Sequence, residues 1–266
     1  MSVLDFVSFV DDLATASGSA ILPFFRSSLA AADKSRGGVF DPVTEADKAA
    51  EAVMRQMIAR AFPGHGIIAE EFGDERAEAE YTWVLDPIDG TKSFISGLPT
   101  WGTLIALQHR GRPVYGLMHQ PFTRERFSGD GHSAQWRGHD GAGAPVSRAL
   151  RTRACDGLGV ATLMSTSPQM FDEPGLDAFR RVERSVRLSR YGGDCYAYCA
   201  LAAGHVDLVI ESGLNPYDIA ALVPVIEGAG GIVTNWAGGG AASGGSIVAA
   251  GDKRMHAAAL KLLNGG

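Results

Sequence analysis

The 266-residue sequence predicts an α/β protein in which an α+β lobe and an α/β lobe form one compact unit. Three observations predict this class. Apolar residues recur at helical spacing near the N-terminus, short apolar segments bounded by turns follow, and the last part of the chain alternates strand-like and helical segments. We expect the first lobe over residues 1–140 and the second over residues 141–266, within a single domain.

Two amphipathic helices are expected first. The spacing of apolar residues predicts one long helix over the first ~28 residues. A second helix is expected over residues 45–61, where Ala50 and Met54 begin the apolar stripe. The loop between them, residues 31–40, contains a pair of glycines that favours mobility.

A sheet is expected next, because the pattern changes from helical periodicity to short apolar segments. Its predicted strands are residues 66–69, 81–85, 103–108, 114–119 and 125–128. A glycine-rich connection around residues 138–145 then leads into the second lobe.

The second lobe is predicted from alternating strands and helices. Its strands are expected at 159–162, 208–211, 231–235 and 247–250, and its helices at 175–184, 195–203, 218–228 and 253–263. The arginine-rich run 180–190 is interpreted as a solvated helix end followed by a strand. The low-complexity stretch 237–245 is interpreted as a hairpin between two strands.

Composition favours a small-molecule ligand. The formal net charge of −6 provides no broad basic field, which argues against nucleic acid or an anionic membrane as a partner. Cys155, Cys195 and Cys199 are too few and too irregularly spaced for a disulfide framework or a zinc site, so a reducing cytoplasm is expected. The sequence has no apolar run of about 18 residues, so we expect no membrane span. Its start is not basic, so we expect no export signal.

Two aspartates, Asp86 and Asp89, follow a strand-like segment in the sequence D-P-I-D-G-T. Pro87 stiffens the turn between them, and the backbone N–H groups of Gly90 and Thr91 would begin a short helix suited to a phosphate. Two carboxylates this close repel each other unless a cation lies between them, and oxygen ligands favour Mg²⁺ over zinc. A turn that uses Asp and Gly only for their backbone preferences is the alternative.

Acidic residues elsewhere strengthen the metal interpretation. Glu70 and Glu71 follow another short strand, so at least one carboxylate emerges at a strand end. Asp47 lies at the start of the second helix, where a capping box with Thr44 would also explain it. Asp218 lies in the first turn of a later helix, where interaction with the helix dipole is the alternative.

Taken together, these segments resemble the inositol monophosphatase family over nearly the whole chain. The matching motifs are D-P-V-T-E-A-D at 41–47, A-E-E at 69–71, W-V-L-D-P-I-D-G-T-K-S-F at 83–94 and N-P-Y-D-I-A-A-L-V-P-V-I-E-G-A-G-G at 215–231. One position departs from the family pattern, because Tyr217 stands where a tryptophan is common. A tyrosine should still form a wall of the pocket.

The resemblance implies a layered αβαβα sandwich, usually dimeric, that hydrolyses phosphate monoesters with two or three Mg²⁺ ions. It implies in-line attack of an activated water on phosphorus, without a covalent phosphoenzyme. By position, the implied metal ligands are Glu70, Asp86, Asp89, Asp218 and the Ile88 carbonyl; the implied catalytic residues are Asp47, Glu70 and Thr91; and Asp89, Gly90, Thr91 and Asp218 also contact the substrate. Glu71 is a less certain partner.

The substrate is predicted from residues outside the metal motifs. In R-Y-G-G-D-C-Y-A-Y at 190–198, Gly193 and Asp194 stand where inositol phosphatases carry a glycine and a small residue, and Glu211 aligns with a substrate-facing position. Two further carboxylates suit a cation better than a neutral polyol. We therefore expect histidinol phosphate, and the local sequences resemble the histidinol-phosphate phosphatase branch of the family. A helix cap for Asp194 and a salt bridge to arginine for Glu211 are the alternatives.

Other functions are less well supported. Inositol-1-monophosphatase is the main alternative. A 3′-phosphoadenosine-5′-phosphate phosphatase would need basic or aromatic groups for a second phosphate and a purine, and the sequence shows no obvious cluster of them. A binding protein that has lost catalysis would normally lack a metal carboxylate, and none of those motifs is missing.

Overall fold

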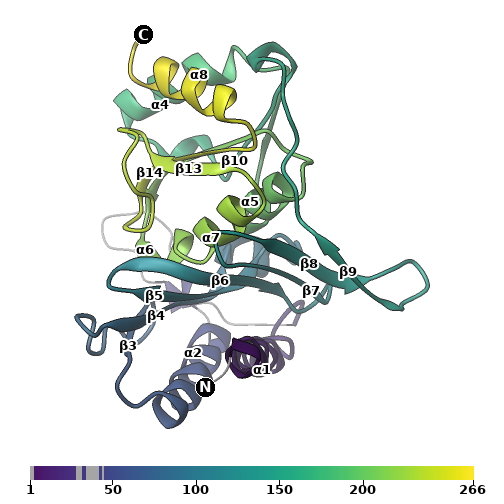
Figure 1. The fold of residues 1–266 in the computed structure, drawn as a ribbon, viewed down its shortest axis with the longest axis vertical. Helices are drawn as coiled ribbons and strands as arrows, with labels where there is room; N and C mark the ends of the chain where they lie inside the picture. Colours follow the sequence, from purple (N-terminus) through teal and green to yellow (C-terminus); the bar gives the residue numbers. More distant parts are fainter. Residues whose placement is uncertain (1–2, 28–31, 34–41, 44) are drawn as a thin grey trace.

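The chain folds into five layers in a computed structural model that describes residues 3–27, 32–33, 42–43 and 45–266. From bottom to top in Figure 1, helices α1 and α2 are followed by a seven-stranded sheet, by α5, α6 and α7, by a five-stranded sheet, and by α4 and α8. Each interface between layers is apolar, as expected for packed helix and sheet layers. The predicted αβαβα sandwich is confirmed.

The lower sheet has the order β3-β4-β5-β6-β7-β8-β9, and only the β3–β4 pair is parallel. Its strands are Gly66–Ala69, Tyr81–Asp89, Gly102–His109, Arg112–Gln120, Glu125–Gly129, Ala134–His139 and Pro145–Ala149. The last two form a hairpin where a connection was expected over residues 138–145. The sheet therefore continues past residue 140, where the sequence analysis divided the lobes.

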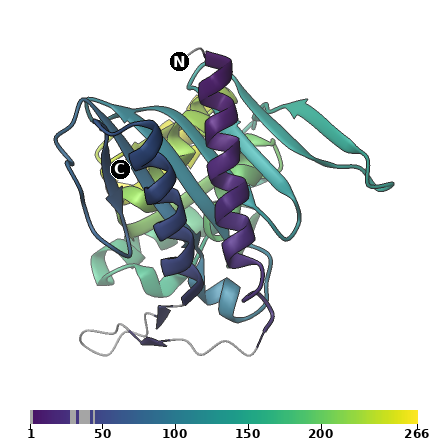
Figure 2. The same ribbon diagram turned by 90° about the horizontal axis from the view of Figure 1, so that it is seen from below.

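Helices α1 (Val3–Ile21) and α2 (Glu45–Ala61) lie side by side across the outer face of this sheet (Figure 2). The first helix is shorter than the ~28 residues expected from its periodicity. Pro23 ends it, because proline has no N–H and its ring clashes with the carbonyl four residues earlier. Phe25 is still buried, as the periodicity indicated, but it lies in the turn after the helix.

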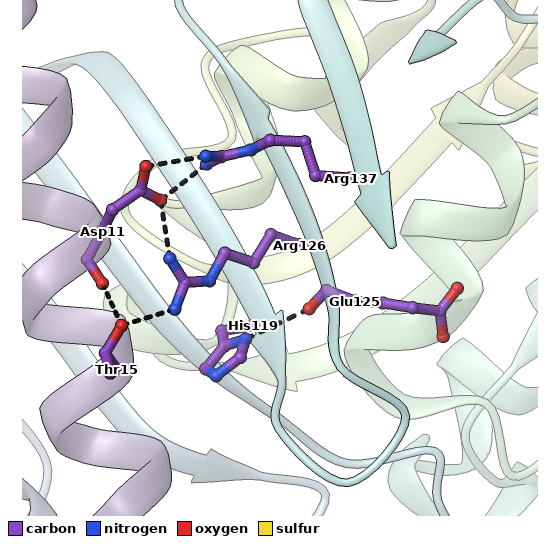
Figure 3. Close-up of polar contacts among 6 residues, drawn as sticks. All are labelled: Asp11, Thr15, His119, Glu125, Arg126 and Arg137. Carbon is purple, nitrogen blue, oxygen red and sulfur yellow. Dashed lines mark hydrogen bonds and ion pairs between the residues drawn. The ribbon is translucent and has the colours of Figure 1, made fainter. Parts of the chain in front are cut away.

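An ion cluster joins α1 to strands β7 and β8 of this sheet (Figure 3). The carboxylate of Asp11 accepts hydrogen bonds from Arg126 Nη1 on β7, at 2.9 Å, and from both terminal nitrogens of Arg137 on β8, at 2.7 and 2.6 Å. Arg126 Nη2 also donates to the hydroxyl of Thr15, one helical turn after Asp11. Charge-assisted pairs of this kind fix the position of the helix as well as attracting it.

The upper sheet has the order β11-β10-β12-β14-β13. Its strands are Thr162–Ser165 (β10), Leu188–Tyr191 (β11), Leu208–Leu214 (β12), Ile232–Asn235 (β13) and Gly245–Ala250 (β14). Helices α4 (Glu173–Glu183) and α8 (Lys253–Leu263) cover its outer face. The expected helix end and strand within 180–190 and the β13–β14 hairpin are confirmed.

Two predicted elements of this lobe are wrong in detail. Residues 158–160 form a 3₁₀ turn, and the strand expected at 159–162 begins only at Thr162, where the backbone pairs with β11 and β12. The helix expected over residues 218–228 is two helices, α6 (Pro216–Ile219) and α7 (Leu222–Gly228). Pro224 explains the break, because it cannot donate to the carbonyl of Ala220 and its ring clashes there.

Several expectations about smaller features can also be compared. The three cysteines are free and buried, so no disulfide forms. Among the described residues, no helix is long and apolar enough to cross a membrane. The capping role of Thr44 and the closure of the loop 31–40 lie outside the described residues, apart from the two-residue strand β1 (Ala32–Asp33), which pairs with β2 (Pro42–Val43).

Candidate active site

Strand β4 carries two aspartates, Asp86 and Asp89, at its C-terminal end. The strand continues beyond Leu85, where we expected it to end, and its pairing with β5 shifts register between Asp86 and Asp89. Gly90 follows with φ of 83°, and the predicted short helix, α3 (Thr91–Ile95), begins directly after it. A side chain at Gly90 would be strained, and its Cβ would lie 2.9 Å from the Cβ of Asp194, so only glycine fits.

Helix α6 brings a third aspartate to the same place. Asn215 caps this helix, and the carboxylate of Asp218 accepts the backbone N–H of Asn215 at 2.7 Å. Asp218 lies in the first turn of α6, the position that the helix-dipole alternative assumed, and it also takes part in a capping box. Neither role excludes a metal, because ligand oxygens of Asp86, Asp89 and Asp218 all lie within 4.8 Å of one another.

The three carboxylates fit a bound cation. Asp86 is 1% exposed, and its Oδ1 atom has no hydrogen-bond partner. Burial raises the pKa of Asp86 well above its usual range, and Glu70 and Asp89 raise it further. Burial likewise raises the pKa of Asp89, with Asp194 next in effect. Ionised acids at this separation need a positive partner, and an all-oxygen set suits Mg²⁺ or Ca²⁺.

A cavity of about 340 Å³ opens over this cluster. Nine residues singled out from the sequence line it: Glu70, Asp86, Ile88, Asp89, Gly90, Thr91, Asp194, Glu211 and Asp218. Tyr217 lines it too, as expected for the residue in the usual tryptophan position. Residues far apart in the sequence are therefore brought to one cavity between the two sheets.

Three other predicted site residues do not line the cavity. Asp47 is buried in the first turn of α2, close enough to contribute to the raised pKa of Asp86. Glu71 follows Glu70 in the turn after β3, where its N–H donates to the carboxylate of Glu51 at 2.7 Å. Gly193 caps α5 and is packed tightly, since a Cβ there would lie 2.6 Å from Met164.

Hydrogen bonds hold the backbone between Asp86 and Asp89. The hydroxyl of Thr91 donates to the carbonyl of Ile88 at 3.1 Å. The hydroxyl of Thr103 on β5 donates to the carbonyl of Pro87 at 2.8 Å, and Ser17 of α1 lies 3.1 Å from Thr103 Oγ1. Ser17 and Thr103 are completely buried. The sequence analysis missed both, because each is separated from the motif along the chain.

Asp194 begins helix α5 (Asp194–Ala202), but it does not cap it. The cap residue is Gly193, with no side-chain hydrogen bond, so the alternative offered for Asp194 is wrong. The Asp194 carboxylate instead accepts from Ser93 at 2.5 Å, and Ser93 in turn accepts from Thr100 at 2.9 Å. Its φ of 45° lies in the left-handed region, which aspartate tolerates better than most residues.

Glu211 on β12 is also buried, and its carboxylate accepts hydrogen bonds from neutral groups. One carboxylate oxygen accepts the N–H of Thr166 at 2.8 Å, and the other accepts the hydroxyl of Tyr198 at 2.9 Å. Within the described part of the chain it forms no salt bridge, so that alternative fails. Burial raises the pKa of Glu211 to about 7, against the lowering effect of Thr166 and Tyr198.

We expect Glu211→Gln to stabilise the metal-free protein near pH 8 by up to about 3 kcal/mol. In the folded state Glu211, with its pKa of about 7, retains a proton that the unfolded glutamate has lost above its ordinary value of 4.5. Wild type therefore loses stability as pH rises through this window, and glutamine does not. Urea unfolding near pH 4 and near pH 8 measures the difference. A gain of the same size at both pH values would contradict this origin.

Other residues of the cavity were missed by sequence reasoning. Lys92 is the basic residue that lines the cavity among the residues the structure describes; burial raises the pKa of Asp194, and Lys92 lowers it. Cys195 contributes its backbone N–H, which donates to the carboxylate of Asp89 at 2.7 Å. Tyr198 could have been found, because it lies four residues after Asp194 on the same helix face.

Comparison with known proteins places this arrangement among phosphatases. The chain matches the model of the inositol monophosphatase family over residues 4–265. It is 46% identical over 263 residues to "Bifunctional phosphatase IMPL2, chloroplastic" of Arabidopsis thaliana, covering 94% of this chain and 72% of that protein. It is 36% identical over 226 residues to the histidinol-phosphatase of Mycobacterium tuberculosis, covering 85% of each.

Solved structures show the same similarity. An inositol monophosphatase from Zymomonas mobilis superposes with a TM-score of 0.86 at 39% sequence identity, and the match covers 99% of both chains. The fold therefore agrees with that of a solved inositol monophosphatase over 99% of this chain.

Proposed function

This chain belongs to the inositol monophosphatase family of metal-dependent phosphomonoester hydrolases, and from that premise we propose that it hydrolyses L-histidinol phosphate to L-histidinol and inorganic phosphate. One observation carries the choice of substrate. Asp194 and Glu211 line the same cavity as the metal cluster, and neither forms a salt bridge within the described part of the chain. The main alternative remains inositol 1-phosphate, and the similarity to the Zymomonas mobilis enzyme favours it.

We propose that Glu70, Asp86, Asp89, Asp218 and the Ile88 carbonyl hold two or three Mg²⁺ ions. The orphaned Oδ1 of Asp86 and the mutual proximity of three carboxylates support this ligand set. When bound, Mg²⁺ would stabilise negative charge on the phosphoryl oxygens and increase the acidity of water. Oxygen ligands from three segments, the turn after β3, strand β4 and helix α6, would hold the ions.

The protein's own groups would orient the reactants. We propose that Thr91 and Glu70, with Asp47 behind them, position the attacking water, and that the N–H groups of Gly90 and Thr91 bind the phosphate. The Thr91 hydroxyl is already oriented by its hydrogen bond to Ile88. Attack on phosphorus then breaks the bond to the ester oxygen, which leaves as an alcohol after taking a proton.

The negative charge of the cavity lining favours a cationic leaving group. Among the described residues, the cavity lining has six carboxylates, from Glu70, Asp86, Asp89, Asp194, Glu211 and Asp218, and the ammonium of Lys92. Asp194 and Glu211 accept hydrogen bonds from Ser93, Thr166 and Tyr198, and these donors are neutral. Histidinol phosphate would add an ammonium and an imidazole to this region. A neutral polyol would add no cation.

We expect Asp194→Asn to reduce kcat/KM for histidinol phosphate by about tenfold or more, which corresponds to one lost charge-assisted contact, and to change that for inositol 1-phosphate less than threefold. Asparagine tolerates the φ of 45° and can still accept from Ser93. Steady-state kinetics on both esters measure the two ratios. Equal losses on both substrates would show that Asp194 supports the fold rather than the choice of substrate.

We also propose a homodimer in a reducing cytoplasm. The three free, buried cysteines support the compartment. Exposed apolar side chains support the dimer: Leu98 is 54% exposed and Phe122 is 44% exposed. Arg26 donates to the carbonyl of Gly97, the residue before Leu98, and lies over the ring of Phe122. Sedimentation equilibrium tests the dimer, and a monomer at micromolar concentration would refute it.

A further inference from the structure

Helix α5 lies between two cavities. Asp194, Cys195 and Tyr198 line the active-site cavity, whereas Tyr196 and Ala200 line a second cavity of about 330 Å³. At about 100° per residue, these two sets occupy opposite faces of one helix. Ala203, directly after the helix, continues the second face. The second cavity is therefore separate from the active site but shares a wall with it.

Three large aromatic side chains contribute to the lining of the second cavity, beside His205 and smaller residues: Phe127 from β7, Trp136 from β8 and Tyr196 from α5. Glu125 fixes two of them, because its carboxylate accepts Trp136 Nε1 at 2.9 Å and the Tyr196 hydroxyl at 2.6 Å. With their polar ends engaged, the rings offer carbon faces to the cavity. Such a surface is preformed for a flat apolar group.

The Glu125 contacts belong to this cavity alone. In Figure 3 the side chain of Glu125 points away from the cluster formed by Asp11, Arg126 and Arg137, while its backbone carbonyl bonds to His119 at 3.1 Å. The Glu125 carboxylate thus holds two aromatic side chains of the lining on one side of the sheet. Arg126 and Arg137 bind Asp11 of α1 on the other side, and neither lines this cavity.

Two further arginines, Arg148 and Arg151, give the cavity a positive rim. The guanidinium of Arg148 lies 4.3 Å from the centroid of the Trp136 ring, a cation–π contact that places its charge over the aromatic lining. In the described part of the chain neither arginine forms a salt bridge. The one acid in the lining, Glu125, already accepts two hydrogen bonds.

We propose that this cavity binds a small aromatic carboxylate, with its ring against Phe127, Trp136 and Tyr196 and its carboxylate on Arg148. An apolar lining beside an unpaired guanidinium has this complementarity, since the ring buries apolar surface and arginine binds a carboxylate bidentately. The site goes beyond the proposed function, because no residue of the metal cluster takes part in it. The ligand would contact helix α5. The same helix carries Asp194 and the backbone N–H of Cys195, which donates to Asp89.

The test titrates indole-3-acetate into the Mg²⁺-loaded full-length protein, with saturating inorganic phosphate to occupy the active site. Ligand-observed NMR should give a Kd on the order of 1 mM or tighter, from about 0.3 kcal/mol per ligand heavy atom. Arg148→Gln should weaken this binding about tenfold and leave the weaker binding of neutral indole within about twofold. Ala200→Leu should abolish binding of both probes by filling the cavity, while kcat stays unchanged in either variant.

Three outcomes would overturn the proposal. One is no binding of indole-3-acetate to wild type at about 10 mM. Another is equal binding to wild type, Arg148→Gln and Ala200→Leu. The third is binding of the probe only when inorganic phosphate is omitted, which would place it in the active site. Because the two variants alter different elements, failure of one to fold leaves the other as a complete test.

Discussion

Replacing Asp89 with asparagine is expected to lower kcat on any phosphomonoester by about 10²–10³-fold or more, while the fold stays intact. The carboxylate oxygens of Asp89, Asp86 and Asp218 converge, so loss of one charge weakens the site for a divalent cation. A bound cation contributes several kcal/mol of transition-state stabilisation, and each 1.36 kcal/mol is tenfold in rate. Phosphate release under saturating Mg²⁺ measures the loss.

The structural side of the same substitution is small. Asparagine keeps an oxygen that can accept the N–H of Cys195, as Asp89 does. Removal of one negative charge should also raise the Tm of the metal-free protein, since neighbouring carboxylates and burial raise the pKa of Asp89.

A matched control is Asp172→Asn. Asp172 caps α4 on the outer layer, and asparagine is an equally good cap, so its kcat should equal that of wild type. If Asp89→Asn retained near-normal kcat, Asp89 would not be a metal ligand.

Removal of divalent metal with EDTA is expected to abolish hydrolysis, and added Mg²⁺ should restore it. Asp86 is buried, its Oδ1 has no protein partner, and four other acids raise its pKa together with burial. Without a cation these groups either stay protonated or repel one another. Activity that is insensitive to EDTA would exclude the carboxylate cluster as the catalytic centre.

The metal-free protein should also respond to pH in a defined direction. The pKa values of Asp86 and Asp89 are raised in the folded state, so the folded chain binds protons more tightly than the unfolded chain does. Stability therefore falls as pH rises above the unfolded value of 3.8 towards the raised values. EDTA-treated protein should have a lower Tm near pH 8 than near pH 6, and Mg²⁺ should narrow the difference. Calorimetry at the two pH values measures it.

The sequence alone was sufficient for elements with a strong local signal. The periodicity of α2 and α8 and the alternation of strands and helices led to the correct layers. The break between α6 and α7 was missed, although Pro224 excludes a continuous helix there. The β8–β9 hairpin was also missed, since Gly138 packs against Trp136 within a strand, and its glycine suggested a linker instead.

The candidate site was predictable to the extent that its residues lie in short motifs. Asp86, Asp89 and Gly90 were found because they are adjacent in sequence. The contacts that hold them were not, since Ser93 reaches Asp194 across 101 residues and Ser17 reaches Thr103 across 86. Hydroxyl residues have no sequence pattern that marks such long-range hydrogen bonds. The cavity behind α5 was missed for the same reason, because it joins side chains from four elements.

The most direct test of the proposed function is a parallel measurement of kcat/KM for L-histidinol phosphate and myo-inositol 1-phosphate by the Mg²⁺-loaded protein. The buried acids Asp194 and Glu211 should favour the cationic substrate by about tenfold or more, which is about 1.4 kcal/mol in the transition state. A tenfold preference for the inositol ester would contradict the proposal and assign the cavity to a polyol.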